Sequence, residues 1–115
     1  MTRAQIAAMI DGIGVPSAYD HFSDRDGEHP QGPPFICFLY QDRDDFHADD
    51  GNYARITQLL IELYTDQVNF TLEDAVEAAL TAAGLPFARS GPAYIEAERM
   101  YQTTYTTEVL LTNAE

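Results

Sequence analysis

Residues 41 to 51, "QDRDDFHADDG", bring five aspartates, one arginine and one histidine together directly after the apolar run "FICFLY". Clustered carboxylates suggest calcium, but an EF-hand loop needs a glycine at its sixth position and a bidentate glutamate at its twelfth. A loop counted from Asp42 has His47 and Tyr53 at those positions, which excludes that spacing. Only an irregular site remains as an alternative to a solvated hairpin loop, and we expect no specific metal site.

Other catalytic and ligand-binding chemistry is equally poorly supported by residue spacing. His21, His29 and His47 are too scattered to form a recognisable zinc site. Cys37 lies in an all-apolar segment, which predicts a buried, inert thiol rather than a nucleophile. With nineteen acidic residues in the chain, fortuitous carboxylate pairs carry little weight, and "DGIGVP" lacks the flanking strand and helix of a phosphate loop. We therefore expect no enzyme activity and no cofactor.

The net charge of the chain limits the classes of molecule that it is expected to bind. Nineteen acidic residues face six basic ones, all arginine, which gives a formal net charge of −13. Such a field repels phosphates and acidic lipids, so we expect no specific nucleic-acid binding and no membrane association. No apolar run approaches the length of a membrane span, and a single cysteine suits a reducing cytosol. The acidity is also consistent with a high-salt environment.

The chain has the usual size of one domain, and we expect residues 1–115 to form one. Apolar residues recur at three- and four-residue intervals from Ile6 to Ile13, which predicts a helix over 4–13 with Thr2 as its cap. The stretch "VPSAYDHF" predicts a short strand ending near Phe22, and "SDRDGEHPQGPP" predicts a loop.

Two apolar segments flank the acidic stretch. "FICFLY" is apolar at every position, which predicts a central strand covered by helices on one face and a neighbouring subunit on the other. In "YARITQLLIELYTD", Leu59, Ile61 and Leu63 alternate with more mixed residues. A helix is possible there, but the β-branched and aromatic residues favour a long strand.

The last third of the chain predicts a helix followed by strands. In "TLEDAVEAALTAAGLP", Thr71 and Asp74 suggest a capping box, and Gly84 and Pro86 mark the end. Its apolar stripe comprises Leu72, Val76, Ala79, Leu80 and Ala83. Alternation in "YIEAERMYQTTYTTEVLL" indicates a strand pair or one long bent strand. The order predicts an α+β fold: a mostly antiparallel sheet of four to five strands, with two helices packed on one face.

Four segments resemble, in the same order, small proteins encoded in the tail-gene clusters of bacteriophages and prophages. They are "VPSAYDHF", "PPFICFLYQDRDDFHADDGNYARI", "IELYTD" and "YIEAERMYQTTYTTEV", and the resemblance runs from about Val15 to Val109. None of them is a catalytic motif. Members of that family look like tail completion or tail terminator proteins, α+β domains that assemble as rings at the head-proximal end of a long tail.

The resemblance implies a structural role at the head-tail junction. The expected partners are further copies of the chain in a ring and other tail or connector proteins, and DNA would pass through the ring without being gripped. The expected location is the host cytoplasm during assembly and then the virion tail. The alternative is a small acidic protein-binding module that shares only the architecture, because fold alone does not fix function.

The acidic hairpin, which contains residues 41 to 51, is the candidate contact with a subunit or partner. The chain departs from the family pattern in its longer first loop, "SDRDGEHPQG", in its lack of lysine and in the extra aspartates of the hairpin. A long hairpin that carries an apolar side chain more often contacts another protein than lacks a binding role. The alternative is a disordered surface hairpin. The predicted contact residues are Asp44, Asp45, Phe46, His47, Asp49, Asp50 and Tyr53.

Overall fold

The computed structural model describes residues 1–20, 32–45 and 55–112, with the backbone alone at 42–45 and 55. Two helices and five strands follow the predicted order of helix, three strands, helix and two strands. They are α1 (Arg3–Asp11), β1 (Ser17–Tyr19), β2 (Phe35–Asp45), β3 (Arg55–Thr65), α2 (Phe70–Ala82), β4 (Phe87–Ile95) and β5 (Met100–Leu111).

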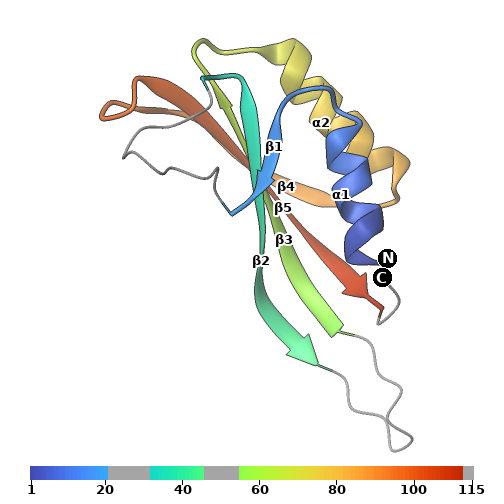
Figure 1. Cartoon of the computed structure of the whole chain (residues 1–115). Helices are drawn as coiled ribbons and strands as arrows, with labels where there is room; N and C mark the ends of the chain where they lie inside the picture. The colour runs from blue at the N-terminus through green and yellow to red at the C-terminus, as the bar shows by residue number, and fades with distance from the viewer. Residues whose placement is uncertain (21–31, 46–54, 113–115) are drawn as a thin grey trace, which may run out of the picture.

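The five strands form one sheet in the order β1-β2-β3-β5-β4. All neighbours are antiparallel except β1 and β2, which are parallel. Both helices lie on the same face of the sheet (Figure 1). This arrangement confirms the predicted α+β fold class. The middle strand is β3 rather than the predicted "FICFLY" strand, β2, because β4 and β5 both add to the same side of β3.

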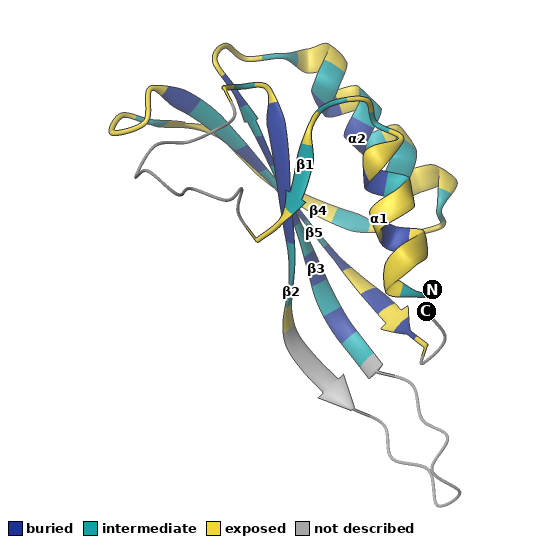
Figure 2. Cartoon of the chain, in the orientation of Figure 1, coloured by how far each residue is buried: buried dark blue, intermediate teal, exposed yellow. Residues whose placement is uncertain are grey.

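The main core lies between the helices and the sheet (Figure 2). Ile6 and Val76 point from the two helices into a layer that includes Ile61 and Tyr105, and all four are completely buried. The predicted alternation in β3 is confirmed, because Leu59, Ile61 and Leu63 are buried while the residues between them are only half-buried. A period of two buries one face of a strand, so the helix alternative for this segment is wrong.

The helix caps confirm one prediction and correct another. Thr2 caps α1 in a full capping box with Gln5. Helix α2 is capped by Asn69, whose side-chain oxygen accepts from the backbone N–H of Leu72 at 3.0 Å. The prediction of Thr71 as the cap is therefore wrong: the helix already begins at Phe70, which places Thr71 inside the first turn with its own helical backbone.

Three strand boundaries differ from those predicted. The acidic stretch was expected to be a loop from residue 41, but β2 continues to Asp45, which pairs in register with Arg55. Backbone groups make the ladder, so polar residues can extend a strand beyond the core. The C-terminal alternation belongs to a hairpin that already begins at Phe87. Strand β1 ends at Tyr19, and Asp20 follows with a φ of 67°. Residues 23–31 and 46–51 of the predicted loops lie outside the described residues.

Candidate functional site

The sheet face opposite the helices is the candidate functional surface, and we call it the open sheet face. Within the described part of the chain, no helix packs against it (Figure 1). Successive side chains along β2, β3 and β5 point to opposite faces of the sheet, and the strand register brings seven half-buried side chains of these strands together on the open sheet face. They are Leu39, Leu60, Glu62, Tyr64, Gln102, Thr104 and Thr106.

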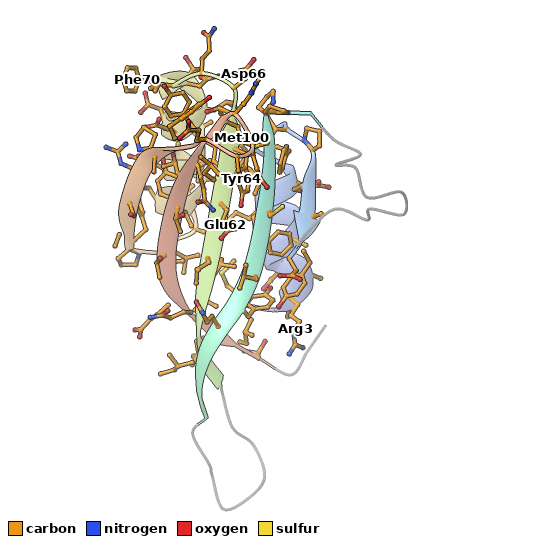
Figure 3. The ribbon with its side chains drawn as sticks, turned by 90° about the vertical axis from the view of Figure 1, so that its left-hand side faces the viewer. Arg3, Glu62, Tyr64, Asp66, Phe70 and Met100 are labelled. Carbon is orange, nitrogen blue, oxygen red and sulfur yellow. The ribbon has the colours of Figure 1, made fainter. Side chains whose placement is uncertain are left out.

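A small apolar cluster closes one end of the open sheet face. Phe35, Cys37 and Met100 are buried there, and Tyr64 packs against them. The rings of Phe35 and Tyr64 stack with their centroids 4.8 Å apart. Figure 3 shows Met100 and Tyr64 close together at the end of the sheet. The burial of Cys37 confirms the prediction made from "FICFLY".

Polar side chains lie directly beside this cluster. The Gln102 Nε2 donates to the Tyr64 hydroxyl at 2.9 Å, and that hydroxyl donates to Glu62 Oε1 at 3.2 Å. Burial raises the pKa of Glu62, the hydrogen bond from Tyr64 opposes that rise, and the charge of Asp20 adds to it. Burial, followed by the charge of Glu62, also raises the pKa of Tyr64. The face therefore holds a carboxylate that is poorly solvated when ionised.

The burial and the nearby negative charges also make the thiol of Cys37 a poor nucleophile. Burial, then the charges of Glu62 and Asp20, raise the pKa of Cys37 to about 11. A reactive cysteine needs the opposite shift, toward the thiolate at neutral pH. The arrangement of Cys37, Glu62 and Tyr64 is thus suited to packing and hydrogen bonding rather than to attack on a substrate.

A second polar network lies on the helix side and joins α2 to the edge strand β4. The Glu73 side chain is only 3 % exposed and pairs with Arg89 at 3.0 Å. Arg89 also contacts Glu77 at 3.1 Å. The Tyr105 hydroxyl reaches Glu77 Oε2 at 3.1 Å and the Glu73 carbonyl at 3.3 Å. A buried carboxylate requires such a partner, so the network locks the helix to the sheet.

The burial of Glu73 was not predicted from the sequence. The available signal was its spacing: positions 73, 76 and 80 lie on one helical stripe, and Val76 and Leu80 are both fully buried. Its partner, Arg89, is sixteen residues away in another element, and no local pattern connects the two.

The predicted contact residues are only partly described. Asp44 and Asp45 belong to the last part of β2, opposite Ile56 and Arg55 of β3. Phe46, His47, Asp49, Asp50 and Tyr53 lie outside the described residues, so their predicted role stays a prediction. In the described ranges, no three His, Cys, Asp or Glu side chains gather as a metal-binding group. No helix in those ranges has the length and apolar character needed to cross a membrane.

Comparison with known proteins shows a similarity in structure rather than in sequence. The sequence matches no protein-family profile and no curated protein. A solved chain described as "Virion of native gene transfer agent (GTA) particle" has a similar structure, with a TM-score of 0.55 and 19 % sequence identity. The similarity covers 93 % of this chain and 86 % of the other. It shows that the fold occurs in a virion chain of comparable extent.

Proposed function

We propose that this chain is a structural component of a phage-derived particle: a tail completion or tail terminator protein that assembles as a ring at the head-tail junction. The observation that carries the proposal is the similarity of nearly the whole fold to a chain of a gene transfer agent virion. The four segments that resemble phage tail proteins point to the same class.

The open sheet face supports an assembly role. Apolar and weakly solvated polar groups, including Leu39, Leu60 and Glu62, share a face that no described helix covers. A sheet face of this kind gains free energy when another protein covers it, because apolar area leaves water. In the proposed particle, that cover is supplied by a neighbouring subunit or another tail protein.

Net charge supports a passage for DNA rather than a grip on it. A ring of subunits that each carry −13 repels the phosphates of a strand moving through it, whereas a basic lumen would hold them. The same repulsion acts between subunits, so we propose that assembly is favoured by salt. The raised pKa of Cys37 is consistent with a role that involves no catalysis.

Sedimentation velocity across a salt and concentration series, with negative-stain images of the concentrated protein, tests this function. The Debye length falls from about 30 Å at 0.01 M to about 3 Å at 1 M salt, so repulsion between subunits weakens while apolar contacts persist. We expect monomers or small species at low salt and ring-shaped assemblies at high salt.

Two results would contradict this reading. A strict monomer at millimolar concentration in both low and high salt would favour the small protein-binding module instead. Tight, salt-sensitive binding to DNA would contradict both functions, because neither predicts affinity for phosphates.

A further inference from the structure

The outer edge of β4 pairs with no other strand in the described part of the chain. The sheet order places β4 at one edge and β1 at the other, and β4 is the outermost strand on the left of Figure 3. Residues 21–31 and 46–54, which are not described, connect β1 to β2 and β2 to β3, all on the far side of β5 from β4. An unpaired edge offers backbone N–H and C=O groups to any strand that approaches, including a strand of another copy.

Strand β4 lacks the charged side chains that commonly protect an edge. The chain has nineteen acidic residues, but Phe87–Ile95 contains none. Its one charged residue, Arg89, is held by Glu73 and Glu77 of α2. The other edge strand, β1, is only three residues long, and shortness itself limits pairing. Strand β4 is therefore the described edge at which pairing between copies would begin.

A β-bulge interrupts this edge near its centre. The register between β4 and β5 shifts between Ser90 and Ala93. Two residues of β4, Gly91 and Pro92, therefore lie opposite one residue of β5, which defines the bulge. The extra residue increases the local twist, and proline has no N–H to donate to a neighbouring strand. The bulge thus divides the edge into two short pieces.

The bulge depends on a backbone conformation that suits glycine alone. Gly91 has a φ of +94°, and a Cβ at this position would lie 2.7 Å from the carbonyl oxygen of Gln102. Gly91 is exposed and Pro92 is half-buried, so neither contributes a buried side chain to the core. A regular strand would instead add a residue pair to the ladder with β5. The bulge therefore disrupts the pairing of its own chain without adding to the core.

We propose that the bulge formed by Gly91 and Pro92 prevents β4 from pairing with strands of other copies. Pairing between sheet edges of different molecules is a common route to aggregation, and a bulge or a proline on the edge opposes it. In a chain whose β4 edge has no acidic residue, the bulge takes the place of charge as the protection. Contacts between copies are then confined to other surfaces. This inference concerns the single chain and does not depend on the proposed ring.

The experiment straightens β4 by deleting Gly91 and combining the deletion with Pro92→Thr. The change restores one residue of β4 opposite one residue of β5 and supplies an N–H where proline has none. The association constant from sedimentation equilibrium is expected to rise roughly tenfold or more, because each contact between copies gains backbone hydrogen bonds. Thioflavin T, a dye that binds to stacked strands, is expected to bind the associated material. Circular dichroism checks that the straightened chain is folded.

Two further variants separate edge pairing from loss of stability. Gly91→Ala strains the backbone but retains Pro92, so it is expected to be less stable and to associate no more than the natural chain. Ser90→Lys, added to the straightened chain, places a lysine at an exposed position of the edge and is expected to restore the monomer. Because the lysine lowers the net negative charge, this rescue cannot come from stronger repulsion between whole subunits.

The inference is overturned if the straightened chain folds and associates no more than the natural chain. It is also overturned if folded Gly91→Ala associates as strongly as the straightened chain, or if Ser90→Lys gives no rescue. If the straightened chain does not fold, Pro92→Thr alone decides, because it keeps the chain length and restores the N–H. That variant is expected to associate more than the natural chain and to bind the dye, and unchanged association overturns the inference. Rings that form without dye binding concern only the proposed function.

Discussion

Met100→Ala tests the cover over the Cys37 thiol at the end of the open sheet face. Cys37 is 6 % exposed and packs in a cluster with Phe35 and Met100. Burial, then the charges of Glu62 and Asp20, raise its pKa from 9.0 to about 11. Both the poor access and the raised pKa slow attack by the thiolate.

The size of the effect follows from the thiolate population. At pH 8, a shift of the thiol pKa from 9.0 to about 11 lowers the thiolate fraction roughly a hundredfold, because each unit changes it about tenfold. Steric cover slows the reaction further. Met100→Ala removes that cover and admits water, so labelling of the folded variant is expected to accelerate by roughly tenfold or more. The lost packing lowers the free energy of unfolding by about 2 kcal/mol.

The assay is the rate of labelling by a chromogenic disulfide reagent at pH 8, in native buffer and in denaturant. Leu110→Ala is the control, because Leu110 is 49 % exposed and pairs with Ile56 at the other end of the face. That variant is expected to label as slowly as the natural chain. The reasoning is refuted if native Cys37 reacts about as fast as it does in denaturant, or if Met100→Ala leaves the rate unchanged.

Three further predictions concern stability. Burial raises the pKa of Glu62, so the protonated form that favours the folded state is lost as pH rises through that pKa. Glu62→Gln is therefore expected to raise the denaturant midpoint of unfolding at pH 7 and to leave it unchanged at pH 3. A lower midpoint at pH 7 would contradict this. Tyr105→Phe removes the hydroxyl that donates to the Glu77 carboxylate and is expected to lower the unfolding free energy by about 1–3 kcal/mol; an unchanged chemical-denaturation curve would argue against that bond. Asn69→Ala is expected to cost about 1 kcal/mol through the lost cap and Thr71→Ala much less, as checked by thermal melts; the reverse order would restore Thr71 as the cap.

Local periodicity was enough to predict most of the fold. The three- and four-residue spacing from Ile6 to Ile13 identified α1. The alternation of Leu59, Ile61 and Leu63 identified β3 as a strand with one buried face and one half-buried face. Those patterns work because each element buries one stripe or one face. They also separated the side chains that meet the helices from those that form the open sheet face.

Boundaries and long-range partners could not be predicted in the same way. The extension of β2 to Asp45 depends on backbone pairing with Arg55, to which side-chain polarity is a poor guide. The burial of Glu73 depends on Arg89, a partner in a different element. Alternation likewise indicates which residues share the open sheet face, but it carries no information about what covers that face in an assembly.

Charge explains why contacts in the proposed ring would depend on apolar surface. Each subunit carries a formal net charge of −13, so bringing copies together is opposed by electrostatic repulsion. Apolar contacts are nearly insensitive to screening, while the general repulsion falls steeply with salt. The proposed ring is therefore expected to gain most of its salt dependence from the whole charge of the subunit and most of its affinity from the apolar side chains of the open sheet face.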